Sequence, residues 1–189
     1  MIRLAVAAAL AAVALVAVPM ARAGGGHYVL DGGTPAERHA VVAALEASSF
    51  DWDLVPAVVT IHIVRGADGF AIPGEIWLDA DLLDAGRFAW GVVQHEYAHQ
   101  VDYFSLDDRL RERFLKLLGA TEWCYGPTPD APHAVYGCER FASTLAWSYW
   151  PSPENCMKPR SPQDESAAMS PRRFRAALDA ALGKAVRKR

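Results

Sequence analysis

The sequence has 189 residues and a mass of 20.6 kDa, with 52% apolar and 22% charged residues. These values suit one compact domain and exclude a disordered or fibrous protein. The formal net charge is −3, and the seven basic residues after Pro171 face only one acid, Asp179, so the rest of the chain is acidic. Duplex nucleic acid, which needs a basic surface, is therefore not an expected partner.

The first 23 residues have the composition of a secretory signal peptide. Residues 4–20 carry no charged side chain, follow Arg3 and precede Ala21-Arg22-Ala23, a small-x-small cleavage pattern. The apolar run is short for a membrane span. We expect cleavage after Ala23 to leave a single secreted domain over residues 24–189, with no stable membrane span. That product keeps 17 basic against 22 acidic side chains, a net charge of −5.

The chain contains three cysteines, Cys124, Cys138 and Cys156, and all of them lie in the expected secreted part. An oxidising compartment allows a disulfide to persist, so one pair and one free thiol are expected. The sequence does not choose the pair. Only Cys138–Cys156 is disfavoured, because a straight helix between them would hold their ends too far apart.

The first half of the chain alternates one helix with short strands. Thr34-Pro35-Ala36-Glu37 has the form of a capping box with proline at the first helical position, and it predicts a helix to about Ser48. The β-branched segment 58–64 predicts a strand, and the segment 65–69 predicts a turn after it. A second strand is predicted over 74–78, either internal or at an edge where an extended peptide can add.

Helical spacing dominates after residue 86. Apolar residues recur at helical intervals over 88–104, 106–118 and 139–150, and Pro171 opens a final basic helix over 172–189. Strands therefore precede most of the helices. This order predicts an α+β fold in which a small sheet packs against the helix over 88–104.

The central motif is His95-Glu96-Tyr97-Ala98-His99, an HExxH sequence within a predicted helix. Residues four apart share one helix face, so the two imidazoles can close on one metal ion while Glu96 points toward its water. This donor set fits zinc. The sequence therefore predicts His95 and His99 as metal ligands and Glu96 as a catalytic base.

A catalytic zinc site needs a third protein ligand and one open position. The metzincin pattern HExxHxxGxxH is excluded, because Asp102 and Ser105 stand where its glycine and last histidine belong. Asp102 lies one turn beyond His99 and is better placed to support an imidazole N–H than to reach the metal. The candidates for the third ligand are Asp102, Glu122, His133 and Glu139.

HExxH followed by Val101-Asp102, and about 40 residues later by Glu-x-Phe-Ala from Glu139, resembles the gluzincin metallopeptidases related to the anthrax lethal factor catalytic domain and the Pro-Pro endopeptidases. The resemblance covers residues 87–150. It implies a zincin-like fold, zinc bound by His95, His99 and Glu139, and Glu96 as the general base.

The sequence departs from that family at two positions. Relatives usually carry an oxyanion-stabilising tyrosine several residues before the ligand glutamate, whereas here Tyr136 stands only three before Glu139. Many relatives also have an acid soon after that glutamate, where this chain has Ser143. Three side chains can donate a hydrogen bond to an oxyanion, and we rank them by closeness to Glu139 as Tyr136, His133 and Tyr125.

The sequence thus predicts a secreted zinc endopeptidase that acts on a peptide or protein substrate. The alternative is a secreted binding or structural protein with a zincin fold and no catalysis. Glu96 argues against this alternative, because a purely structural zinc site has no need of an acid beside its first ligand. A non-peptidase zinc hydrolase is a third class, but its usual cysteine ligand precedes HExxH, while all three cysteines here follow it.

Overall fold

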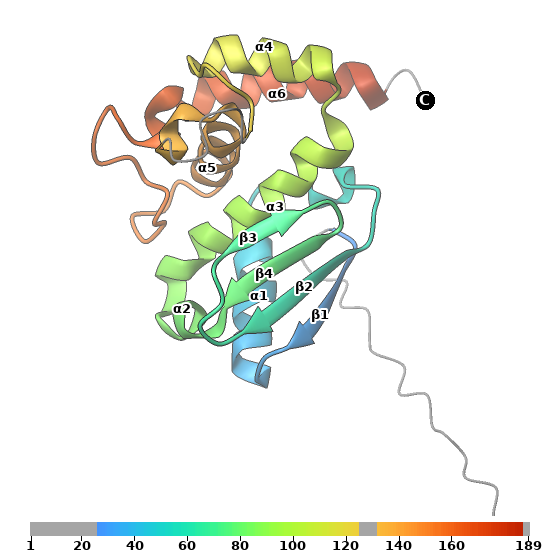
Figure 1. Cartoon of the computed structure of the whole chain (residues 1–189), viewed down its shortest axis with the longest axis vertical. Coiled ribbons are helices and arrows are strands. Elements are labelled where there is room, and N and C mark those ends of the chain that lie inside the picture. Colours follow the sequence, from blue (N-terminus) through green and yellow to red (C-terminus); the bar gives the residue numbers. More distant parts are fainter. Residues whose placement is uncertain (1–25, 125–131, 187–189) are drawn as a thin grey trace, which may run out of the picture.

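The computed structural model describes residues 26–124 and 132–186 (Figure 1). The predicted signal peptide and Tyr125 lie outside these residues. In chain order the elements are β1 (Tyr28–Gly32), α1 (Pro35–Ala47), η1 (Trp52–Leu54), β2 (Val59–Val64), β3 (Phe70–Ile72), β4 (Glu75–Asp79), α2 (Ala80–Asp84), η2 (Gly86–Ala89), α3 (Trp90–Ser105), α4 (Asp108–Leu118), η3 (His133–Val135), α5 (Gly137–Tyr149), η4 (Glu165–Ala168) and α6 (Pro171–Val186), where η marks a 3-10 helix.

A four-stranded mixed sheet forms one side of the molecule, in the order β1-β2-β4-β3. The pairs β1–β2 and β2–β4 are parallel, and β3 runs antiparallel to β4. Along β2, Val59, Ile61 and Ile63 are buried while the residues between them are partly exposed. This alternation gives the sheet one apolar face, and Figure 1 shows α1 and α3 behind that sheet.

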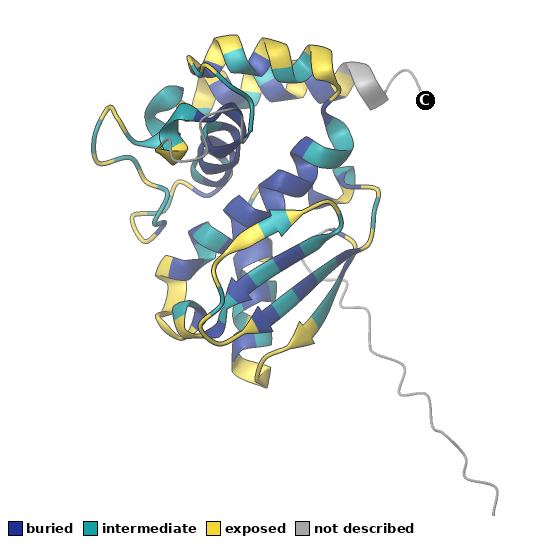
Figure 2. Cartoon of the chain, in the orientation of Figure 1, coloured by how far each residue is buried: buried dark blue, intermediate teal, exposed yellow. Residues whose placement is uncertain are grey.

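Helix α3 connects the sheet to the helical half of the chain. It contacts α1, β3 and β4 on one side and α5 on the other, and α5 in turn packs against α4 and α6. Figure 2 shows α3 buried along most of its length. Its Val93, Tyr97 and Val101 belong to the hydrophobic core. A helix enclosed on so many sides holds its remaining, polar side chains in fixed positions.

The α+β class and most of the predicted elements are confirmed. Helix α1 has the full capping box: the Thr34 hydroxyl accepts from Glu37 N–H and the Glu37 carboxylate accepts from Thr34 N–H. The strand predicted over 74–78 is β4, which lies inside the sheet, so of the two alternatives the internal strand is confirmed. The edge strand beside β4 is β3, a strand of three residues that the sequence pattern did not predict because it follows a turn directly; β1 forms the opposite edge.

The structure also settles the choice among the cysteines. Cys124 and Cys138 form a disulfide with a Cα–Cα distance of 5.6 Å, and Cys156 is free. Such a bond persists in an oxidising compartment, as expected for an exported protein. Within the two described ranges, no helix has both the length and the apolar composition to cross a membrane.

Buried tyrosines give the fold an alkaline limit. Burial raises the pKa of Tyr28 to about 12, with a further contribution from the Glu46 charge, and burial also raises the pKa values of Tyr97 and Tyr149. Unfolded tyrosines ionise near pH 10, so above that pH the unfolded state releases protons first.

We expect the free energy of unfolding to be insensitive to these buried tyrosines below about pH 10 and to fall toward pH 12. Urea unfolding at stepped pH measures this decline, which should be shallower for Tyr28→Phe; an identical slope for the two proteins would contradict it.

Candidate metal centre

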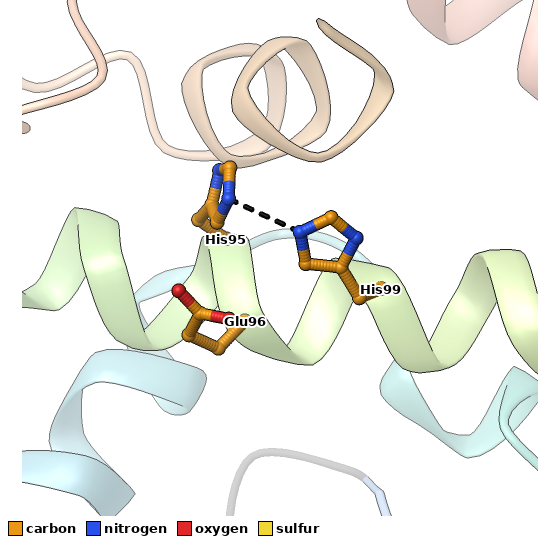
Figure 3. Close-up of side chains that lie close together, drawn as sticks. All are labelled: His95, Glu96 and His99. Atoms are coloured by element: carbon orange, nitrogen blue, oxygen red, sulfur yellow. Dashed lines mark hydrogen bonds between the residues drawn. The ribbon is translucent and has the colours of Figure 1, made fainter. Parts of the chain in front are cut away.

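Three buried side chains bring their polar atoms together between α3 and α5. The Nε2 atoms of His95 and His99 lie 3.2 Å apart, and Glu139 Oε2 lies 3.2 Å from the first and 3.6 Å from the second. All three residues are less than a tenth exposed. Figure 3 shows the two imidazoles projecting from α3 toward α5, with Glu96 beside them on the same helix.

These separations can be compared with the edges of a zinc coordination tetrahedron. A tetrahedral ion with bonds of about 2.0–2.1 Å separates its nitrogen and oxygen ligands by about 3.3–3.4 Å. The three separations observed here are 3.2, 3.2 and 3.6 Å. Two imidazoles and one carboxylate are also a donor set that zinc accepts with an open fourth position. The residues present therefore fit a zinc ion.

The position of Glu139 depends on how α5 begins. Glu139 lies in the first turn of α5, whose N–H groups have no partner within the helix. Two of them are satisfied from another segment: Gly137 N–H donates to Glu122 O at 2.7 Å, and Cys138 N–H donates to Trp123 O at 2.8 Å. We call residues 122–124 the strap. It fixes the start of α5 and with it the carboxylate that follows.

The electrostatics of the centre favour a charged pair when no metal is bound. Burial opposes a charge on His95, but its hydrogen bond with Glu139 and the neighbouring carboxylate charges raise its pKa to about 9. Burial also opposes ionisation of Glu139, yet hydrogen bonds from the two imidazoles hold its pKa well below the ordinary value. Burial raises the pKa of Glu96, against the opposing charges of His95 and His99. A cation is thus favoured beside Glu139.

A hydrogen-bonded chain fixes the orientation of His95. Its Nδ1 lies 3.0 Å from Ser143 Oγ, and Ser143 Oγ lies 2.6 Å from Glu165 Oε2. The Ser143 hydroxyl donates to the carboxylate, so its oxygen accepts from Nδ1–H, and Nε2 faces the centre. Ser143 stands where many of the family relatives carry an acid. Its hydroxyl links His95 to the carboxylate of Glu165 on η4. Nothing in the sequence pattern points to Glu165.

Asp102 does not support an imidazole as predicted. Its carboxylate accepts from Arg111 Nε at 2.8 Å and from Trp123 Nε1 at 2.9 Å. It thus ties α4 and the strap to α3. His99 Nδ1 is buried and has no hydrogen-bond partner in the part of the chain that the structure describes. Among the described residues, the Nδ1 atom of His95 thus has a hydrogen-bond partner and that of His99 has none.

A cavity of about 250 Å³ opens onto the centre. Besides the three potential ligands it is lined by Glu96, by Gly69 to Ala71 and by two possible donors, Tyr103 and His133. Tyr136, the first-ranked donor from the sequence, is almost fully buried at the start of α5 and is not among the lining residues. The 3-10 turn η3 places His133, and not Tyr136, at the cavity.

Two other candidates for the third ligand lie apart from the paired imidazoles. Glu122 pairs through its backbone with Tyr136 and belongs to none of the groups of potential ligand atoms found among the described residues. His133 lines the cavity but is likewise outside those groups. Besides Glu139, two acids share a group of potential ligand atoms with His95, namely Glu96 and Glu165, and the ligand atoms of each group lie within 4.8 Å of one another.

The chain was compared with protein-family models, with curated proteins and with solved structures, and none of them matches it.

Removing the Ser143 hydroxyl tests the support of His95. We expect Ser143→Ala to weaken zinc binding about 10- to 100-fold, because Nδ1–H loses its acceptor and the imidazole loses its fixed orientation. Glu165→Gln should have a smaller effect in the same direction, since the amide oxygen still accepts. Competition with a chromophoric chelator measures both affinities.

Ser148 provides the matched control for Ser143. It lies on the same helix, it is fully buried, and its hydroxyl has no hydrogen-bond partner among the described residues. Ser148→Ala should leave zinc affinity unchanged. Equal losses in Ser143→Ala and Ser148→Ala would mean that packing of α5, and not the hydrogen bond to His95, governs affinity.

Proposed function

We propose that this protein is a secreted zinc-dependent endopeptidase with a zincin-like fold. The observation that carries the proposal is the spacing of the His95, His99 and Glu139 ligand atoms, which matches the edges of a zinc tetrahedron. Glu96, buried beside them and bordering a cavity, supports a hydrolytic role over a structural one. The apolar N-terminal segment and the disulfide support export.

Zinc, when bound, polarises a carbonyl and makes a water acidic enough to give up a proton near neutral pH. Glu96 is the group in this chain that receives that proton and returns it to the leaving amine. Burial raises its pKa, which suits a group that must both take and give a proton. Glu96 follows His95 directly on α3, and its carboxylate lies within 4.8 Å of ligand atoms of His95 and His99.

The oxyanion that develops on the scissile carbonyl needs a hydrogen-bond donor. His133 and Tyr103 both line the cavity, but the Tyr103 hydroxyl already donates to Ala71 O at 2.9 Å. We therefore assign the donor role to His133 in place of Tyr136. The sequence ranked His133 second by closeness to Glu139 along the chain, and the cavity lining supports placing His133 first.

The substrate lies along the edge strand in this proposal. Residues 69–71, at the start of β3, border the same cavity as Glu96, and a Cβ on Gly69 would stand 3.5 Å from Glu96 Oε1. An extended peptide beside β3 would carry its backbone past this carboxylate. A side chain at position 69 would narrow the approach, so glycine keeps the path open.

The alternative function is a secreted zinc-binding or structural protein without catalysis. Such a protein would normally close the fourth position with another histidine or cysteine. In the oxidised chain described here, Cys138 is engaged in its disulfide. Because the Cys138 sulfur is bonded to Cys124 and a cavity lies beside Glu96, the fourth coordination position of a bound zinc would stay open, which favours the hydrolase.

Glu96→Gln tests the hydrolase directly. We expect this variant to keep its zinc and to lose about 10²- to 10⁴-fold in kcat, because the amide cannot accept the proton. Zinc content by metal analysis and cleavage of a peptide library measure the two properties separately.

The matched control is Glu46→Gln, which removes the same charge from an exposed position on α1. Equal cleavage by wild type and Glu96→Gln would remove Glu96 from the mechanism, and wild type that binds zinc but cuts no peptide would favour the non-catalytic alternative.

The donor assignment predicts a ranking of three variants. His133→Ala should lower kcat about 10²- to 10³-fold with little change in zinc affinity, because it acts only on the developing charge. Tyr136→Phe should leave kcat close to that of wild type, and Tyr103→Phe should fall between them. Steady-state kinetics on one cleaved peptide gives the ranking; a larger loss in Tyr136→Phe than in His133→Ala would restore the assignment made from the sequence.

A further inference from the structure

A second group of potential ligands overlaps the candidate metal centre. Cys138 Sγ, His99 and Glu139 offer ligand atoms that all lie within 4.8 Å of one another, and Sγ is 3.9 Å from Glu139 Oε1. Zinc–sulfur bonds of about 2.3 Å give a sulfur-to-oxygen edge of about 3.6 Å in a tetrahedron. The observed separation is measured to Oε1, whereas Oε2 faces the imidazoles, so a small movement of the Cys138 and Glu139 side chains would bring the sulfur into coordination.

The disulfide withholds Cys138 from this role. Its sulfur is bonded to Cys124 and carries no negative charge, whereas the form of cysteine that binds metals is the thiolate. Cys138 is fully buried, but Cys124 is partly exposed. A reductant can therefore reach the bond from the Cys124 side.

We propose that Cys138 is a latent fourth ligand of the metal centre, released when the Cys124–Cys138 disulfide is reduced. This inference rests on the metal site of the proposed function. It adds a residue that the HExxH pattern does not contain and a redox state in which the centre is closed.

The exchange balances with a dithiol as the reductant. One thiolate of the dithiol attacks Cys124 Sγ, the sulfur–sulfur bond breaks, and its electron pair leaves with Cys138 Sγ as a thiolate. The second thiol of the reductant then attacks the mixed disulfide, which releases Cys124 as a thiol and the reductant as a cyclic disulfide. The protein gains two electrons and the dithiol loses two. The Cys138 thiolate then binds the cation beside Glu139.

The surrounding contacts keep Cys138 in place after reduction. The strap stays attached through Trp123, whose Nε1 donates to Asp102 and whose carbonyl accepts from Cys138 N–H. Two histidines, a glutamate and a thiolate close a tetrahedral site, so no position remains for a water beside Glu96. Reduction should thus strengthen metal binding and stop hydrolysis. Loss of the disulfide by itself, without coordination, would weaken metal binding or leave it unchanged.

Two serine variants separate coordination from loss of the crosslink. Both Cys124→Ser and Cys138→Ser lack the disulfide, but only the first keeps a thiol at position 138. Both variants are made in a parent protein that carries Cys156→Ser and keeps the Cys124–Cys138 disulfide. Cys138 is therefore the sole thiol of the Cys124→Ser variant. Each protein is loaded with Co²⁺ for absorption spectra and with Zn²⁺ for chelator competition, and circular dichroism monitors folding.

We expect a sulfur-to-cobalt charge-transfer band in Cys124→Ser and none in Cys138→Ser or in the oxidised parent. Zinc should bind Cys124→Ser more than about tenfold tighter than Cys138→Ser, through the added thiolate. Reducing the oxidised parent with a water-soluble phosphine, removed before loading, should produce the same band. This measurement needs no substitution of Cys124 or Cys138, so it decides the matter even if a variant fails to fold.

The outcomes distinguish this inference from the proposed function. If the oxidised parent binds Zn²⁺ but neither Cys124→Ser nor the reduced parent shows the band, Cys138 is not a ligand and the peptidase proposal stands. If the oxidised parent binds neither metal, the metal site itself is wrong and both proposals fall. A band of equal strength in Cys124→Ser and Cys138→Ser would also overturn the assignment, because it would place the bound sulfur at either cysteine.

Discussion

The carboxylate of Glu139 is buried against two imidazoles, and the packing of α5 on α3 depends on how its charge is balanced. Its Oε2 lies 3.2 Å from His95 Nε2 and 3.6 Å from His99 Nε2, and all three side chains are less than a tenth exposed. A buried charge without a partner costs several kcal/mol, so a cation, whether a proton on His95 or a metal ion, belongs at this point. The helical half and the sheet half of the chain thus meet at a polar centre.

The strap is the structural element that brings this carboxylate to α3. Trp123 links three parts of the chain, because its indole donates to Asp102 and its carbonyl caps α5. Gly137 makes room for this arrangement: a Cβ there would lie 2.7 Å from the Trp123 ring. Asp102 therefore acts on the centre at a distance, through the segment that starts α5, although it is only three residues from His99.

Helical periodicity explains what could be predicted of the site. His95 and His99 share a face of any helix, so their convergence needed no knowledge of the rest of the fold. Glu139 was expected through a family resemblance, and the structure brings its carboxylate beside them. Glu165 and the true partners of Asp102 come from segments with no regular spacing relative to the motif, so their contacts arise only from tertiary packing. For the same reason, closeness to Glu139 along the chain ranked Tyr136 above His133, although His133 is the one that lines the cavity.

The brevity of β3 has a consequence for selectivity. A strand of three residues offers few backbone groups to a neighbour, and the carbonyls of Ala71 and Ile72 already accept from Tyr103 and Gln100 on α3. This protected rim discourages edge-to-edge aggregation of copies of the chain. It also limits how much a bound peptide gains from main-chain pairing. Discrimination between peptides would then rest on how their side chains fit the cavity that the start of β3 borders.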